Sequence, residues 1–300
     1  MRMLRTMMID PNPDVLDLLP GEYRPVYDRL LEVAAEDARV VRVWLSGSLG
    51  RGTADAGSDL DVVLVIDDPD FKAFAADWRE WLGRVTPTVL ARELPGAPGS
   101  WYSVTPDCAR FDAIVVPVGS QIAARTSGRL LVYDRDAQPG ADLSAETATA
   151  DSEDPGPGPN PDNLLGLVEE FLRQQASFAP SVVSRDDWLL GVAAIEQVQM
   201  LLYQLFVESN QPLPPSGAKQ WSAKLTARQR QRCGELLVPR AERDAIIDGM
   251  LTTATAFRAE AATILAAHDV PWPDALDAAV RAQQARTLGW QFPAPLTAGR

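Results

Sequence analysis

Histidine and cysteine are scarce in this chain of 300 residues, and their scarcity excludes several kinds of chemistry. His268 is the only histidine, and the two cysteines are Cys108 and Cys233. A Ser-His-Asp triad, or a zinc or iron site with several histidines, would have to be built around that one ring. Two cysteines make neither a disulfide framework nor a zinc cluster. His268 follows a predicted helix, where we expect it to interact with the last carbonyl groups.

Positive charge is also in short supply. Lys and Arg number 28 against 41 Asp and Glu, which gives a formal net charge of −13. This balance repels a polyphosphate backbone, so no nucleic-acid partner is expected and RNA tailing is disfavoured. It attracts a cationic small molecule instead. The N-terminus lacks the pattern of a secretory signal, and no run approaches the ~20 apolar residues of a membrane span, so we expect a cytoplasmic protein without a membrane partner.

The first half of the chain alternates between helical and strand patterns. Apolar residues at helical spacing predict helices over 23–38 and 71–85. Apolar, β-branched segments predict strands over 39–46, 59–68, 87–93, 100–106, 110–118 and 128–136. The pattern is typical of a mixed, twisted sheet flanked by helices, and we assign this domain to residues 1–136.

The second half has a different composition. Residues 137–162 are rich in Pro, Gly, Asp and Ser, which predicts a linker. From 163 to 286 the pattern is helical almost without interruption, which predicts an all-α helical bundle domain. Residues 287–300 are expected to form a tail. The predicted fold class is therefore α+β, with a sheet domain followed by a helical domain.

One stretch, "WLSGSLGRGTADAGSDLDVVLVIDD" (44–68), needs a chemical explanation. Asp59 and Asp61 open a strand of Val, Leu and Ile, and residues i and i+2 of a strand point to the same face. Two like charges held this close are costly without a cation between them, and this strand contains no Lys or Arg. Carboxylate oxygens suit Mg²⁺, which usually shares its ligand shell with substrate phosphates.

The glycine-rich turn before this strand supplies a second feature. Gly47 lets the backbone approach a ligand closely, and Ser48 offers a hydroxyl and an amide at the start of a predicted helix. Phosphates held at this turn would lie next to a metal ion held by the two aspartates. Arg51, in the same turn, could also reach a phosphate.

Two-metal phosphoryl or nucleotidyl transfer usually needs a third carboxylate from a neighbouring strand. Asp112, at the start of the strand 110–118, is the candidate, and Glu93 is its rival. The third carboxylate would hold the second metal ion, or take the proton of the attacking hydroxyl as a general base.

At these residues the sequence resembles the nucleotidyltransferase superfamily of the DNA polymerase β type, and more narrowly the antibiotic nucleotidyltransferases that modify aminoglycosides or lincosamides. The superfamily pattern is met by Gly47, Ser48, Asp59 and Asp61, with Asp112 as the third acid. The resemblance implies a nucleoside triphosphate donor, with ATP expected, and two Mg²⁺ ions. It also implies transfer of a nucleoside monophosphate to a hydroxyl group with release of pyrophosphate.

The resemblance also draws attention to three residues of the helical half. Lys219 and Lys224, in "PPSGAKQWSAKL", would supply cations for the triphosphate, although outward-facing lysines at a helix start explain them equally well. Glu196 lies in a segment that is apolar nearly all round, so it is expected to be buried. It would then receive an amine or hydroxyl of the substrate, or a structural hydrogen bond from a neighbouring helix.

Two other functions fit the same residues. The chain could place AMP on a protein, as antitoxin-type nucleotidyltransferases do, although those are short and the Arg-x4-6-His motif of that family is absent before His268. It could also be a nucleotide-binding module without activity, which the presence of all three acids disfavours. The first choice remains an enzyme that transfers AMP to a small, cationic, hydroxylated acceptor. Both a monomer and a homodimer are compatible with the sequence.

Overall fold

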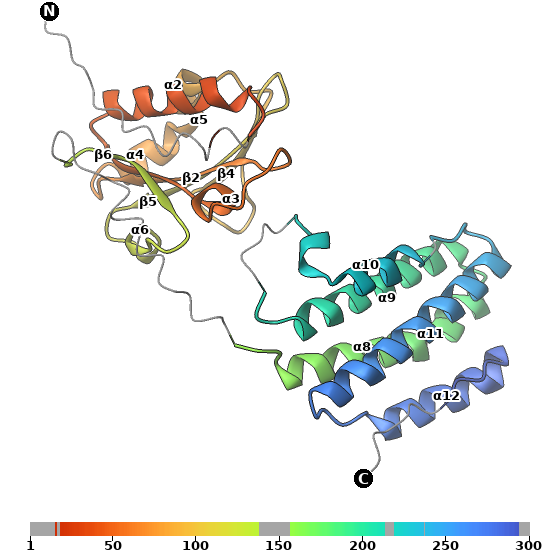
Figure 1. Cartoon of the computed structure of the whole chain (residues 1–300). Helices are drawn as coiled ribbons and strands as arrows, with labels where there is room; N and C mark the ends of the chain where they lie inside the picture. Colours follow the sequence, from red (N-terminus) through yellow and green to blue (C-terminus); the bar gives the residue numbers. More distant parts are fainter. Residues whose placement is uncertain (1–15, 17–18, 138–156, 214–218, 237, 294–300) are drawn as a thin grey trace, which may run out of the picture. The chain divides into compact units, whose positions relative to one another are not determined.

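The computed structural model describes residues 16, 19–137, 157–213, 219–236 and 238–293. The chain forms two compact units (Figure 1). The N-terminal unit consists of residues 1–154 with 215–219, and the helical unit of residues 155–214 with 220–300. The predicted linker 137–162 lies largely outside the described residues, and the domain boundaries drawn from the sequence stay a prediction.

A six-stranded mixed sheet forms the centre of the N-terminal unit. Its strands are β1 (Val40–Leu45), β2 (Leu60–Ile66), β3 (Leu90–Glu93), β4 (Ser100–Val104), β5 (Arg110–Pro117) and β6 (Leu130–Asp134). They lie in the order β3-β4-β5-β2-β1-β6. The central pair, β2 and β5, is parallel, and the other neighbours are antiparallel. The sheet with its helices, followed by a helical region, confirms the predicted fold class.

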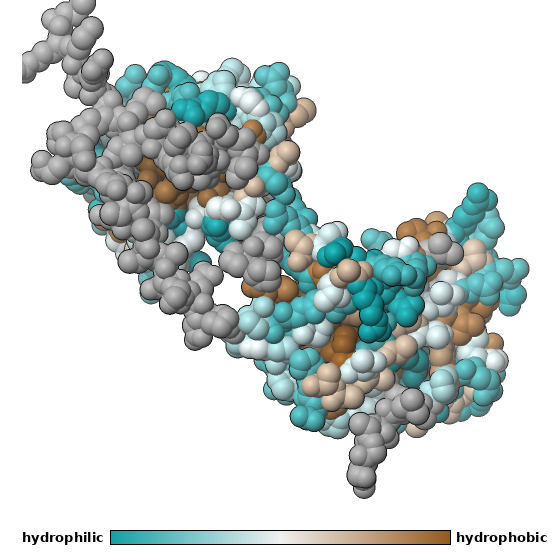
Figure 2. Space-filling view, in the orientation of Figure 1, coloured by the Kyte–Doolittle hydropathy of each residue, from teal (hydrophilic) through white to brown (hydrophobic). Residues whose placement is uncertain are grey.

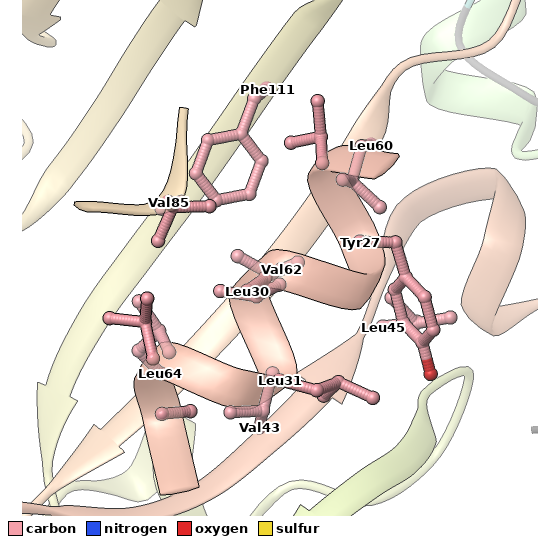
Figure 3. Close-up of a cluster of buried hydrophobic side chains, with 14 of the residues drawn as sticks. Tyr27, Leu30, Leu31, Val43, Leu45, Leu60, Val62, Leu64, Val85 and Phe111 are labelled. Atoms are coloured by element: carbon pink, nitrogen blue, oxygen red, sulfur yellow. The ribbon is translucent and has the colours of Figure 1, made fainter. Parts of the chain in front are cut away.

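Helices cover one face of this sheet. They are α2 (Tyr23–Glu36), α4 (Phe71–Ala76) and α5 (Trp78–Val85). Figure 3 shows Tyr27, Leu30 and Leu31 of α2 packed against side chains of the strands, among them Val43 and Val62. Most of these side chains are almost wholly removed from water, and apolar burial of this kind contributes about 25 cal/mol for each Å². The packing fixes the sheet that carries the aspartates.

The predicted helix 71–85 is divided in the structure. Asp77 ends α4 and begins α5, and its backbone φ and ψ of −88° and 2° are not helical. Trp78 and Trp81 of α5 stack on each other with ring centroids 5.5 Å apart, and Phe74 of α4 packs beside them. The break therefore keeps the predicted apolar side of the helix buried while it changes the course of the chain.

The opposite face of the sheet carries a smaller apolar cluster. It contains Val41, Trp44, Val63, Val65 and Val116 of the strands, with Ala123 from the short helix α6 (Gln121–Ala124). Asp61 and Asp112 point to this face, because they lie two residues before Val63 and Ile114 on their strands. Asp61 and Asp112 therefore lie near the start of their strands, on the same face of the sheet as α6.

The helical unit is built from long helices, as the sequence predicts. They are α8 (Pro161–Ser181), α9 (Trp188–Ser209), α10 (Ala227–Gly234), α11 (Arg243–Ala267) and α12 (Asp274–Leu288), with 3₁₀ turns at Val183–Arg185 and Ser222–Lys224. Asn160 caps the start of α8, where its side chain accepts the amides of Asp162 and Asn163. In the core, Phe171 of α8 stacks on Phe257 of α11 at 4.0 Å. His268 is the C-cap residue of α11.

The structure bears on two expectations about this unit. Trp290 and Phe292, which fall within the predicted tail, are buried, and Trp290 stacks on Phe178 with ring centroids 5.7 Å apart. Their aromatic area keeps this segment on the bundle beyond Gly289. In addition, α9 is by length and composition long and apolar enough to cross a membrane. A core helix of a bundle meets the same criterion, and Ile195, Leu202 and Leu205 of α9 are buried within the unit.

Candidate active site

The turn between β1 and β2 brings the backbone against a carboxylate. Gly47 has a φ of +58°, a conformation that glycine adopts at little cost. A Cβ atom at this position would lie 1.9 Å from Oδ2 of Asp61. The Ser46 amide also donates to the Asp61 carbonyl at 2.9 Å. Glycine is therefore required here twice, for its conformation and for the close approach of the Asp61 side chain.

The helix predicted after this turn is a single turn, α3 (Gly47–Gly50). Gly50 packs so closely that an added Cβ would lie 2.4 Å from the Gly128 carbonyl oxygen. Ser48 is 9% exposed, so the turn presents little of its side chain to water. A helix of four residues has almost no macrodipole. A phosphate at this turn would therefore be held by individual amides, with little contribution from a helix dipole.

The central parallel pair of strands sets two of the acids side by side. Asp61 on β2 is the direct partner of Asp112 on β5 in the register of the ladder. Neighbouring strands lie about 4.8 Å apart, and residues that are partners across a ladder point to the same face. Asp59 stands two residues before Asp61. The structure therefore brings together the three aspartates that the sequence singles out.

Crowding of these acids changes their titration. The pKa of Asp61 is raised to about 6. Burial is the largest cause, and the neighbouring carboxylates of Asp112 and Asp59 add to it. Burial, followed by the charge of Asp59, also raises the pKa of Asp112. Lys219 and Arg51 act in the opposite direction on Asp61. Burial and mutual repulsion of the acids therefore outweigh the nearby cations at both Asp61 and Asp112.

Asp59 has cationic partners of its own. Its carboxylate, 11% exposed, forms ion pairs with Arg110 and Lys219. Arg110 also donates to the Gly57 carbonyl at 2.7 Å, and its backbone amide donates to the Tyr23 hydroxyl at 3.1 Å. Lys219 belongs to the same compact unit as the sheet. A cation bound by Asp59 would therefore compete with two side chains that are already there.

The donor set nevertheless fits a divalent metal ion. Three carboxylates meet at one end of two strands, and oxygen ligands are those that Mg²⁺ prefers. A divalent charge would offset both the burial and the repulsion that raise the pKa values of Asp61 and Asp112. Within the described ranges, no group of three or more His, Cys, Asp or Glu side chains has its ligand atoms gathered as a metal site. In this structure the Asp59 carboxylate is instead paired with Arg110 and Lys219.

A cavity of about 400 Å³ opens beside these acids. Gly47, Asp61 and Asp112 line it together with Trp101 and Tyr102 of β4. Tyr102 is the direct partner of Asp112 in the antiparallel pairing of β4 with β5. Sequence reasoning missed Tyr102 and Trp101, because the pairing of β4 with β5 is not encoded in either strand alone. It also missed Arg110, whose spacing of two residues from Asp112 was a usable signal.

The structure gives the rival acid Glu93 a different place. Glu93 ends β3 at the edge of the sheet, and its Oε1 accepts the Gly99 amide at 2.8 Å. This hydrogen bond closes the turn between β3 and β4. Two strands separate β3 from β2, so Asp112, and not Glu93, is the acid placed beside Asp61.

The two other candidates of the helical half lie in the helical unit. Lys224 ends the 3₁₀ turn Ser222–Lys224, and its carbonyl accepts a hydrogen bond from the Asn210 amide group. Glu196 is exposed on α9, which corrects the expectation that it is buried. Its segment is apolar on nearly all sides because α9 also faces a cavity, and Glu196 lines that cavity.

Comparison with known proteins supports the reading of the N-terminal unit. Residues 28–93 match the family described as nucleotidyltransferase domain. The match includes Gly47, Ser48, Asp59 and Asp61. The N-terminal unit thus carries a nucleotidyltransferase domain of the DNA polymerase β type, and a domain of this family implies a transferase. The predicted class of enzyme is confirmed. Members typically use a divalent metal ion and a nucleoside triphosphate.

Solved structures show more distant similarity. An aminoglycoside 6-adenyltransferase from Bacillus subtilis is 13% identical, with 87% of this chain and 96% of that chain covered and a TM-score of 0.36. A nucleotidyltransferase-like protein from Exiguobacterium sibiricum 255-15 is 14% identical, with 90% and 89% covered and a TM-score of 0.32. Such TM-scores do not establish a common arrangement of whole chains, so neither structure informs the choice of substrate. No curated protein matches the sequence significantly.

Proposed function

We propose that the protein transfers AMP from ATP, with Mg²⁺, to a hydroxyl group of a small cationic acceptor such as an aminoglycoside or a lincosamide. The observation that carries this proposal is the placement of three aspartates beside the Gly47 turn. Asp61 and Asp112 are partners in the ladder of β2 and β5, and Asp59 lies two residues earlier. The nucleotidyltransferase domain over residues 28–93 supports the reaction class.

Asp59, Asp61 and Asp112 would hold the two metal ions that the reaction needs. When bound, Mg²⁺ would neutralise charge on the triphosphate and lower the pKa of the acceptor hydroxyl. Asp61 is held against the Gly47 backbone, so its carboxylate has little freedom to leave the site. Asp59 would exchange its contact with Lys219 for metal, and the released ammonium group would then be available to the phosphates.

The chain's own residues account for the remaining steps. The acceptor oxygen forms a bond to the α-phosphorus, and the bond from that phosphorus to the bridging oxygen breaks, so pyrophosphate leaves. Asp112 takes the proton of the hydroxyl group, for which its raised pKa makes it a better base. Ser48, Arg51 and Lys219 would bind phosphate oxygens, and the charges of Arg51 and Lys219 already act on Asp61. Tyr102 and Trp101 line the cavity next to the reacting groups.

Charge supports a cationic acceptor. The formal net charge is −13, which raises the local concentration of cations around the protein and lowers that of polyanions. The same charge disfavours RNA as the acceptor, since RNA binding depends on clustered Lys and Arg.

Pyrophosphate release tests the proposal. Each of ATP, GTP, CTP and UTP is incubated with the protein, Mg²⁺ and a panel of aminoglycosides and lincosamides. We expect release that requires Mg²⁺, one acceptor and ATP, with the acceptor gaining the mass of AMP. The Asp61→Asn variant is the control and should release none. Transfer of label from ATP to a protein band, with none to any small acceptor, would contradict the proposal and favour protein AMPylation.

A further inference from the structure

The helical unit contains a cavity that the transfer reaction does not explain. It has a volume of about 480 Å³ and runs along α9, from Val192 to Tyr203. Trp221, Cys233, Leu236, Val238 and Pro239 complete its described lining. Sites for small molecules typically measure roughly 300–1,000 Å³. The cavity therefore has the size of a binding site for one small molecule.

Its walls are apolar and partly aromatic. Tyr203 and Trp221 stack with ring centroids 4.4 Å apart and an angle of 18° between the ring planes. Trp221 is 48% exposed and Val238 is 81% exposed, so apolar area at the cavity is open to water. Figure 2 shows apolar surface, in brown, on the helical unit. A flat apolar ligand would cover this surface and extend the aromatic stack.

The polar groups that line the cavity favour a ligand with a positive charge. Glu196 is the one carboxylate among the described lining residues, and no Lys or Arg is among them. In the described part of the chain Glu196 has neither an ion pair nor a hydrogen bond. The Tyr203 hydroxyl is buried and lacks a hydrogen-bond partner among the described residues. Burial raises the pKa of the Cys233 thiol, which is thus neutral at pH 7.

We infer that this cavity binds a small molecule with a flat apolar body and a single protonated amine. The apolar walls and the Tyr203–Trp221 stack take the body, and Glu196 takes the amine. An anion would meet Glu196 without a compensating cation, and a polyamine would leave its further charges against apolar walls. The inference concerns binding by the helical unit, and it does not depend on the proposed transfer reaction.

Calorimetric titration of the full chain with three matched probes tests this inference. The probes are 1-naphthylmethylamine, 1-naphthalenemethanol and 1-naphthoate, which share one ring system and are cationic, neutral and anionic at pH 7.5. At low salt we expect the amine to bind roughly tenfold more tightly than the alcohol, because Glu196 adds a charge-assisted hydrogen bond. The naphthoate should bind more weakly than both. Methylammonium, which lacks the ring, should give no measurable heat.

Two variants and a control assign the effect to the cavity. Glu196→Gln should abolish the preference for the amine and leave the alcohol unaffected. Trp221→Ala should weaken the amine and the alcohol by a similar factor of about five, because it removes half of the aromatic stack. Glu169→Gln, which removes an exposed acid of α8 outside the cavity, should keep the preference. Equal affinity for amine and alcohol, an unchanged preference in Glu196→Gln, or no binding of any probe overturns the inference.

Discussion

Asp61 is costly to the folded protein when it is ionised. Burial, with the nearby charges of Asp112 and Asp59, raises its pKa from 3.8 to about 6. A carboxyl group whose pKa is higher in the folded state binds its proton more tightly there, so stability falls as the pH rises from about 4 to about 6. Above pH 6 the whole cost is present, about 1–3 kcal/mol in the absence of a metal ion.

Replacing Asp61 should therefore separate stability from activity. In EDTA at pH 8, Asp61→Asn should increase the free energy of unfolding by about 1–2 kcal/mol, since the charge is removed from a crowded, buried position. The gain should nearly disappear near pH 4, where the carboxyl group of the wild type is protonated in the folded state and partly protonated in the unfolded state. Pyrophosphate release should fall by more than about a thousandfold.

Denaturant unfolding at pH 4, 6 and 8 measures this effect as the difference between variant and wild type. Asp107→Asn, which changes an exposed acid in the turn after β4, is the matched control and should give no gain. A loss of stability in Asp61→Asn at pH 8 would show that the carboxylate is stabilised, and not strained, by its surroundings.

Gly47 and Gly52 offer a matched pair of substitutions at the same turn. Both have positive φ values, +58° and +67°, so alanine costs backbone strain of about 1 kcal/mol at either position. At Gly47 the new Cβ would also lie 1.9 Å from Asp61 Oδ2, whereas at Gly52 nothing lies within 4 Å. Gly47→Ala should therefore displace the Asp61 carboxylate and reduce kcat/KM by about a hundredfold or more.

Gly52→Ala should lower the melting temperature, because alanine at this position introduces backbone strain similar to that at position 47. Its kcat/KM should stay within about threefold of the wild type. Kinetics and thermal unfolding of the two variants together check the prediction. If the two variants lose activity equally, the turn acts through its backbone conformation alone, and the contact with Asp61 is not what requires glycine at position 47.

At the scale of elements, the register of β2 and β5 decides which acid completes the site. The ladder places Asp112 beside Asp61, while Glu93 accepts the Gly99 amide two strands away from β2. Asp112→Asn should abolish pyrophosphate release. It should also remove most of the binding of Mn²⁺, which can be measured by the paramagnetic resonance signal of the ion. Glu93→Gln should retain both, because the Gln carbonyl still accepts the amide of Gly99. The reverse result would assign the third carboxylate to Glu93.

Local sequence patterns predict much of the fold and of the candidate site. The alternation and β-branched content around Asp59 and Asp61 predict β2, and the helical spacing of apolar residues predicts α2 and the long helices of the second unit. Asp59 and Asp61 could be identified as candidate site residues because a buried strand rarely begins with two acids. Local patterns do not carry strand partners, so the pairing of Tyr102 with Asp112 could not be predicted. The spacing of Arg110 and Asp112 places Arg110 on the face of the acids, but it does not name Asp59 as its partner.

Other misses have similar causes. An apolar helix was taken as buried on every side, but Glu196 lies on the side of α9 that faces a cavity, and hydrophobicity does not distinguish a cavity wall from a core. The break at Asp77 falls between two aromatic residues whose burial holds both halves of the predicted helix in place. The segment after α12 continues no helical pattern and is expected to form a tail, yet two aromatic side chains, Trp290 and Phe292, are buried.

At the scale of the whole molecule, the two units have separate cores, so we expect each unit to have its own free energy of unfolding. The core of the N-terminal unit centres on α2 and the sheet, and that of the helical unit on residues such as Phe171 and Phe257. Each core buries enough apolar side chains to fold as a unit of its own. The carboxylate cluster lies wholly in the first unit, and the amine-selective cavity wholly in the second.

A substitution in one core should consequently leave the chemistry of the other unit intact. Phe257→Ala removes a ring that stacks on Phe171 at 4.0 Å and is fully buried, so it should destabilise the helical unit by about 3–5 kcal/mol. Scanning calorimetry should show one of two transitions at lower temperature, while Mn²⁺ binding by the aspartates at 20 °C persists. Phe111→Ala, in the core beneath the sheet, should lower the other transition and weaken Mn²⁺ binding. Equal shifts of both transitions in either variant would mean that the two units unfold as one.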